Sequence, residues 1–167
     1  CMEKEFNLWK VGPPAVLVKQ DHAYSALFSP DSQRVLVAFR GNQVRVYDTR
    51  SGRALPSITL PFEDLFGIPS LKWSPDGKQL LCNAALAPDS SVITPFLRVV
   101  DLEGWARTVV GHDWGHCGSA AWLPDGQRII FTGVPRQKPS GSKSDLYAVS
   151  VDGSTPPEIR TAESRYG

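Results

Sequence analysis

The chain has 167 residues, enough for one globular domain with a sizeable core. Hydrophobic residues make up 41% and charged residues 21%, and the net charge of +1 excludes the overall positive field that attracts nucleic acid or an anionic membrane. No apolar run approaches the roughly 20 residues that span a bilayer, so no transmembrane segment is expected.

The N-terminal segment, "CMEKEFNLWK", lacks the apolar stretch of a signal peptide. Cys1 suits the lipid-carrying cysteine of a mature bacterial lipoprotein, although any processed or excised fragment can begin this way. With Cys82 and Cys117 it makes three cysteines, an odd number that cannot pair completely within one chain. Further along, "FNLWKV" alternates, "GPP" turns and "AVLV" resumes, so residues 1–20 are expected to hold two strands.

A proline-aspartate turn between two apolar runs occurs three times, in "LFSPDSQRVLV", "LKWSPDGKQLL" and "AWLPDGQRIIF". Proline presets the second position of a type I turn, aspartate tolerates the third, and glycine takes the left-handed conformation that follows. Each copy therefore predicts a β-hairpin. Ser32 replaces the glycine in the first copy. A serine in the left-handed conformation is less stable than a glycine there by on the order of 1 kcal/mol. Leu123 replaces the leading serine in the third.

The three turns recur at long and similar intervals. Their leading aromatic residues, Phe28, Trp73 and Trp122, are 45 and 49 positions apart. Two more strands are predicted after each hairpin, in "QVRVYDTRSG" and "SITL", "FLRVVDLEG" and "RTVV", and "DLYAVSVDGS" and "EIRT". A repeat of roughly 40 to 50 residues with four short strands is typical of a β-propeller. The predicted fold is therefore all-β, with blades of four antiparallel strands over residues 21–61, 62–111 and 112–162.

The turn motifs "FSPDS", "WSPDG" and "WLPDG" and the third-strand motifs "VRVYDTRSG", "LRVVDLEG" and "LYAVSVDGS" resemble those of TolB-type and WD-repeat β-propellers. One departure is Ser150, which stands where the first two blades carry Asp48 and Asp101. The resemblance implies an incomplete part of a six- or seven-bladed propeller. Residues 1–20 would be the last two strands of a preceding blade and residues 163–167 the start of a further one. Alternatively, the two terminal half units complete one another, within one chain or between chains.

In this family, the loop into each first strand and the loop between the second and third strands share one face, which commonly carries the binding site. The second blade has a long loop there, "AALAPDSSVITP", and the third has "GVPRQKPSGSKS". Arg136, Lys138 and Lys143 make the third-blade loop basic, which suits an acidic partner. Phe62 and Phe66, in the loop into the second blade, either contact a partner or pack between blades.

The densest chemical cluster is the loop expected before the third hairpin, "VGHDWGHCGSAAW". Its ligand-type side chains, with a tryptophan between them, suggest either a metal site or a partner surface. No CxxC pair and no helical HExxH accompanies them, so the metal signal is weak. The favoured interpretation is a structural role, in which His112 or His116 satisfies main-chain groups of the turn. The residues concerned are His112, Asp113, Trp114, His116 and Cys117.

The sequence contains no Gly-x-Ser-x-Gly elbow, phosphate-binding glycine loop or paired carboxylates at a catalytic spacing. We therefore expect a non-enzymatic scaffold, without a cofactor, that binds protein, peptide or carbohydrate through loops on one face. One alternative is the propeller portion of a prolyl oligopeptidase-like serine peptidase, whose catalytic domain is encoded elsewhere. Another is a metal-dependent polysaccharide lyase, because histidine-rich rims also occur in such propellers. The resemblance to TolB implies a periplasmic or cell-envelope protein, with the cytoplasm as the other option.

Overall fold

The computed structural model describes residues 6–9, 16–20, 23–39, 43–60, 70–86, 94–103, 105–139 and 141–159. This part of the chain is all-β, as predicted, and forms a two-stranded sheet followed by three four-stranded sheets, which we call the first, second and third blades. The two-stranded sheet consists of β1 (Phe6–Trp9) and β2 (Val16–Gln20). No helix in the described ranges is long and apolar enough to cross a membrane.

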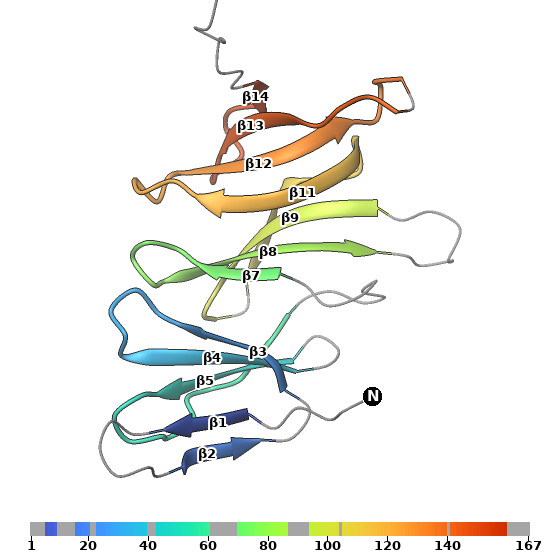
Figure 1. Cartoon of the computed structure of the whole chain (residues 1–167). Coiled ribbons are helices and arrows are strands. Elements are labelled where there is room, and N and C mark those ends of the chain that lie inside the picture. The colour runs from blue at the N-terminus through green and yellow to red at the C-terminus, as the bar shows by residue number, and fades with distance from the viewer. Residues whose placement is uncertain are drawn as a thin grey trace, which may run out of the picture.

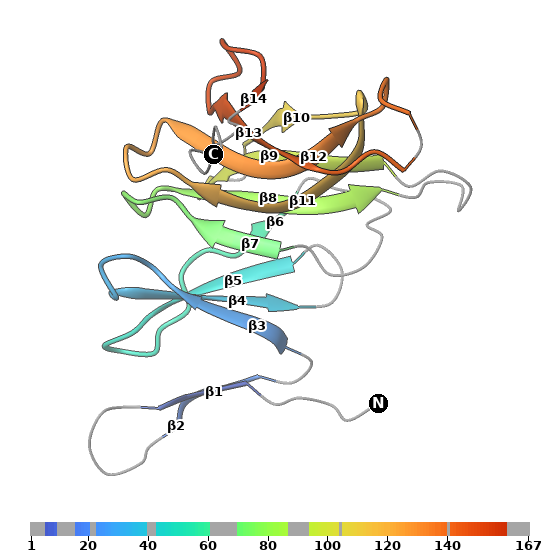
Figure 2. The same ribbon diagram turned by 45° about the horizontal axis from the view of Figure 1, so that its top comes forward.

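Each blade is an antiparallel meander in which strands that follow one another in the chain are paired. The three blades lie in chain order, as Figures 1 and 2 show, so the prediction of consecutive four-stranded units is confirmed. The first blade contains β3 (Ala23–Phe28), β4 (Arg34–Phe39), β5 (Gln43–Asp48) and β6 (Ile58–Thr59); the second contains β7 (Ser70–Trp73), β8 (Gln79–Leu86), β9 (Thr94–Asp101) and β10 (Ala106–Val110); the third contains β11 (Trp114–Trp122), β12 (Arg128–Pro135), β13 (Asp145–Ser150) and β14 (Glu158–Ile159).

The proline-aspartate turns form the tight reversals that the sequence predicts. In the second blade, the Ser74 hydroxyl donates to the Asp76 carboxylate at 2.6 Å and accepts from the main-chain N–H of Gln79 at 2.9 Å. The Ser74 hydroxyl, followed by the main-chain N–H of Lys78, lowers the pKa of Asp76. Gly77 takes the left-handed conformation, with φ at 68°. The first blade repeats these bonds, and there Ser32 adopts a φ of 58° despite its side chain.

The third turn replaces the missing hydroxyl with an ion pair. Leu123 cannot bond the turn aspartate, and Asp125 instead binds the Arg128 guanidinium, with oxygen–nitrogen distances of 2.7 and 2.8 Å. The same carboxylate accepts the main-chain N–H of Gln127 at 2.9 Å. The turn geometry is therefore retained through a different set of bonds.

The first and second blades are buried on both sides because alternate residues of a strand point to opposite faces of a sheet, and each face packs on a neighbour. In β4, Leu36 and Ala38 pack toward the second blade, whereas Val35 and Val37 pack on the other side. In β8, Leu80 and Leu81 divide in the same way between the two neighbouring cores. A central strand of these blades therefore needs apolar residues on both faces, which explains the continuous apolar runs after the first two turns.

Side chains tie the first strands of adjacent blades together. The Trp73 indole N–H donates to the main-chain oxygen of Leu27 at 3.0 Å, and that of Trp122 donates to the main-chain oxygen of Lys72 at 3.3 Å. Phe28 occupies the equivalent place in the first blade but has no N–H, and its side chain is 58% exposed. The aromatic position of the repeat is therefore an inter-blade hydrogen-bond donor where it is tryptophan.

The ends of the blades form two opposite faces. The three proline-aspartate turns project to one side, at the left of Figure 1, which we call the turn face. The start of β11 and the end of β12 lie on the opposite side, which we call the loop face. The sequence led us to expect a loop as far as Ala121, but β11 already begins at Trp114.

Candidate functional site

On the loop face, the turn before β11 and the connection after β12 form one unit. Trp114 and Pro135 are paired across the two strands, so segments some 20 positions apart meet there. Arg136 joins them: its main-chain N–H donates to the Asp113 oxygen at 2.8 Å, its Nε to the His112 oxygen at 3.0 Å, and its Nη2 reaches the Trp114 oxygen at 3.5 Å. The structure therefore brings together residues that the sequence placed on two separate loops. We call His112, Asp113, Arg136 and Lys138 the rim cluster.

The main-chain oxygens of this turn are thus satisfied by an arginine. The sequence suggested that His112 or His116 would perform this role. A guanidinium presents several N–H donors in a fixed plane, so one side chain can hold two carbonyl groups at once. Arg136 was predicted only as part of a basic loop, and its structural role could not be read from the sequence.

Trp114, which we expected on the partner surface, is instead buried. Its ring lies edge-on to Phe131 and Tyr147, at centroid distances of 4.9 and 4.6 Å. It also covers Gly133, where an added Cβ would be only 2.7 Å from the Trp114 ring. The correction follows from packing: a large apolar ring gains most in the space that this glycine leaves open. Trp114 therefore anchors the rim cluster to the core.

His116 lies on β11 and is exposed. A Cβ built on Gly118 would lie 2.4 Å from Thr132 Oγ1 and 3.2 Å from His116 Nε2, so both side chains approach the bare glycine. The Asn83 amide donates to the Gly118 oxygen from the second blade. Gly118, Asn83 and Thr132 were not predicted from the sequence. The one local indication was Gly118 itself, a glycine two positions after His116.

Two bulges in β11 explain why this strand was taken for a loop. The register shifts between Trp114 and His116, and again between Cys117 and Ala120. Each bulge adds a residue and breaks the alternation by which a strand is recognised. Bulges are common where a strand redirects a functional side chain, and here they leave His116 exposed beside two buried neighbours, Trp114 and Cys117.

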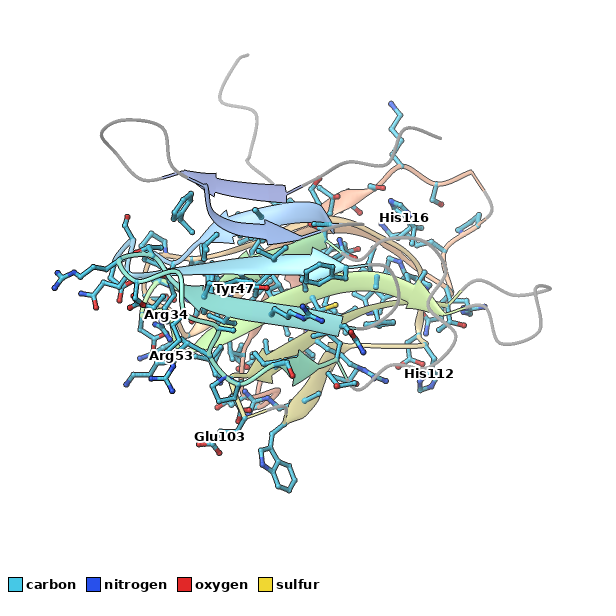
Figure 3. All side chains as sticks on the ribbon, turned by 90° about the horizontal axis from the view of Figure 1, so that it is seen from below. Arg34, Tyr47, Arg53, Glu103, His112 and His116 are labelled. Atoms are coloured by element: carbon cyan, nitrogen blue, oxygen red, sulfur yellow. The ribbon has the colours of Figure 1, made fainter. Side chains whose placement is uncertain are left out.

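The possible metal ligands do not converge. His112 Nε2 lies 3.2 Å from the Asp113 carboxylate, with both side chains well exposed. His116 lies apart from His112 in Figure 3. Cys117 points into the core, where burial raises the pKa of its thiol to about 12. Within the described ranges, no three His, Cys, Asp or Glu side chains come together as a metal would require.

The basic side chains of the connection after β12 differ in how they are held. The Lys138 ammonium binds the Asp145 carboxylate, which raises the pKa of Lys138. The Tyr147 hydroxyl is buried and has no hydrogen-bond partner within the described part of the chain. Lys143 is exposed. Phe62 and Phe66 lie outside the described residues.

No family model matches this sequence. Solved structures of several propeller proteins are similar in fold. An oligogalacturonate lyase in complex with manganese has a TM-score of 0.69 and 13% identity over 87% of this chain. A TolB-like protein from Agrobacterium tumefaciens has a TM-score of 0.58 and 17% identity over 89% of it. Acylaminoacyl peptidase from Pyrococcus horikoshii has a TM-score of 0.60 and 15% identity over 86% of it.

At these identities the likeness concerns the fold, and it confirms the prediction of β-propeller blades. The chain spans 42% of the lyase, 52% of the TolB-like protein and 25% of the peptidase. It therefore corresponds to part of a propeller in each of them. One fold that serves a lyase, a peptidase and a TolB-like protein leaves function to be argued from the site.

Proposed function

We propose that this chain is part of a non-enzymatic propeller scaffold that binds an acidic segment of a partner protein or peptide. The contacts would be made by the rim cluster of the third blade and by Lys143 on the same connection. The observation that carries this proposal is the environment of Arg136. Within the described ranges its side chain donates to uncharged main-chain oxygens, so its positive charge is not neutralised by a carboxylate there. The guanidinium is also exposed.

The charges around Arg136 support an anionic partner. Lys138 is paired with Asp145, so these two charges largely compensate one another. His112 Nε2 lies 3.2 Å from the Asp113 carboxylate. Arg136 and Lys143 remain as exposed cations on the same connection. A carboxylate can pair with the planar guanidinium through two hydrogen bonds, whereas a cationic partner would be repelled. Because Trp114 anchors the turn to the core, the cluster is held in place before a partner arrives.

Fluorescence anisotropy with a fluorescein-labelled, glutamate-rich peptide that lacks apolar residues tests this proposal. Lys143→Glu is expected to weaken binding about fivefold or more, and more strongly at low salt. Arg50→Glu is the matched control, because Arg50 is an exposed cation on the turn face. Equal weakening by both variants, or no saturable binding by the wild-type chain, would contradict the proposal.

A metal-dependent lyase is the second candidate, favoured by the likeness to the lyase fold and by the exposed His116 beside Gly118. An acidic oligosaccharide also carries carboxylates, so it would meet the same cations. Incubation with oligogalacturonate and Mn²⁺, with formation of an unsaturated product as the readout, separates the candidates. Turnover that is lost in His116→Ala would replace the scaffold proposal with an enzymatic one.

We propose a periplasmic or cell-envelope location for the scaffold, which the likeness to a TolB-like fold supports. Fractionation of cells that produce the native gene product tests this location, and recovery in the cytoplasm would contradict it. The peptidase alternative requires an α/β-hydrolase domain in the same gene. The complete open reading frame tests that directly.

A further inference from the structure

A second surface lies on the turn face, where the first and second blades meet. It is a pocket of about 250 Å³, which we call the inter-blade groove. All but one of the described lining residues are apolar. They come from β4, β5 and β6 and from the connections between the third and fourth strands of the two blades: Arg34, Val46, Leu55, Pro56, Ile58 and Leu102. The groove is remote from the rim cluster. In Figure 3, Arg34 and Arg53 lie on the side of the molecule opposite to His112.

The floor of the inter-blade groove is part of the core. Val46 and Ile58 are buried in the cluster between the two blades, and Leu102 packs against that cluster. Leu55 forms one wall: its main-chain N–H donates to the Val46 oxygen at 2.8 Å, which fixes the backbone next to β5. Its side chain is nevertheless 37% exposed. The groove is therefore formed by fixed elements and does not need a rearrangement to open.

Arg34 is the one charged residue among the described residues that line the groove. Its Nη2 donates to the Gly77 oxygen at 2.9 Å, and its guanidinium lies over the Trp73 ring at 5.3 Å. Both partners are uncharged, and the nearest carboxylate is that of Asp31 at 4.0 Å, which the Ser29 hydroxyl already binds. The guanidinium is thus held rigidly beside apolar walls with an incompletely compensated charge. A carboxylate at the mouth of the groove would complement it.

We propose that the inter-blade groove binds a short peptide segment of a partner protein, in which one branched aliphatic side chain fills the pocket and a neighbouring acidic residue pairs with Arg34. The volume suits a single side chain of that size and is too small for a drug-sized ligand, which needs roughly 300 Å³ or more. A fixed cation next to an apolar pocket selects a sequence in which apolar and acidic residues adjoin. This site is independent of the rim cluster.

The test uses a fluorescein-labelled peptide with a central pair of leucines flanked by aspartates, and anisotropy as the readout. Leu55→Ser removes the exposed wall of the groove, and we expect it to raise Kd about tenfold. The matched control is Leu146→Ser, because Leu146 is also exposed, at 40%, but lies on β13. This control is expected to bind as the wild-type chain does. Circular dichroism of both variants reports whether they are folded.

Further arms separate the alternatives. A peptide with alanines in place of the leucines is expected to bind poorly and equally to wild-type and Leu55→Ser chains. Excess glutamate-rich peptide and the Lys143→Glu variant are expected to leave leucine-peptide binding unchanged, so the two proposed sites can fail separately. Equal weakening by Leu55→Ser and Leu146→Ser would overturn the groove proposal. So would sedimentation of the wild-type chain as a dimer that Leu55→Ser dissociates, because the occupant would then be a second copy.

Discussion

Trp73 in the second blade donates its indole N–H to the main-chain oxygen of Leu27 in the first blade, a residue 46 positions earlier in the chain. Trp122 makes the same bond to Lys72, 50 positions earlier. The Lys72 ammonium in turn donates to the main-chain oxygen of Ala120 in the third blade. These bonds explain why a tryptophan precedes the turn in the second and third blades: its indole joins one blade to the blade before it.

Trp73→Phe is expected to lower the free energy of unfolding by about 1–2 kcal/mol, because the Leu27 oxygen loses its donor in a partly buried place. Urea unfolding followed by circular dichroism measures the loss. Trp105→Phe is the control, since Trp105 is 76% exposed and its replacement is expected to change stability little. Equal effects of the two substitutions would show that the inter-blade bond contributes nothing.

Ser32→Gly is expected to stabilise the chain by about 0.5–1 kcal/mol. Ser32 adopts a φ of 58°, a conformation that glycine takes without steric cost. Part of the gain is offset because glycine makes the unfolded chain more flexible. The reverse change in the second blade, Gly77→Ser, should destabilise, more so because a Cβ there would lie 3.0 Å from Arg34 Nη2. Paired urea midpoints test both signs.

Gly118→Ala is expected to destabilise the third blade by about 1–3 kcal/mol, because the added methyl group would lie 2.4 Å from Thr132 Oγ1. The exposed imidazole of His116 would also have to move. Gly153→Ala provides the comparison: it has a φ of 73° but no atom within 4 Å, so it reports backbone strain alone. Urea unfolding gives stability, and the NMR shift of the His116 ring reports its position.

Asp152, in the turn between β13 and β14, is expected to make stability fall in acid. The pKa of Asp152 is lowered from 3.8 to about 2, chiefly by hydrogen bonds from Ser154, with smaller contributions from Ser150 and Arg107. A carboxyl group whose pKa is depressed in the folded state stabilises that state at pH values above its pKa in the unfolded chain, which is near 4. This contribution is lost as the pH falls toward 2. The urea midpoint of Asp152→Asn should therefore approach that of the wild-type chain across this interval. A constant difference would contradict the shift.

Cys82 and Cys117 are expected to be unreactive in the folded protein. Burial raises the pKa of each thiol to about 12, so almost no thiolate is present at pH 8. In a Cys1→Ser variant, a colourimetric thiol reagent should detect essentially no thiol until urea is added, and then two per chain. Rapid reaction without urea would show that these thiols are accessible.

The sequence predicts correctly those features of the fold that depend on residues close together in the chain. The proline-aspartate turns and the strands beside them depend on neighbours within a few positions. The recurrence of these turns then reveals the repeat of four-stranded units, which the structure confirms. The rim cluster depends on distant partners. Arg136 contacts His112 across 24 positions, and Asn83 contacts Gly118 across 35. No local pattern encodes these contacts.

β11 shows the same limit within a single strand. Its inward residues, Trp114, Cys117 and Ala120, are three positions apart because of the two bulges, so they do not alternate. Trp114 was consequently assigned to a surface loop, although its ring is needed to cover Gly133. Period-two analysis fails at bulged strands for this reason.

The ties between blades also bear on how this protein could change in evolution. Each four-stranded sheet is self-contained in its main-chain pairing. Within the described ranges, the blades are joined to one another by hydrogen bonds from side chains and by apolar contacts. Duplication or deletion of a whole repeat would leave every ladder intact and would require only that a new neighbour offer a carbonyl to the tryptophan. Rings of different size can thus arise from the same unit by unequal recombination.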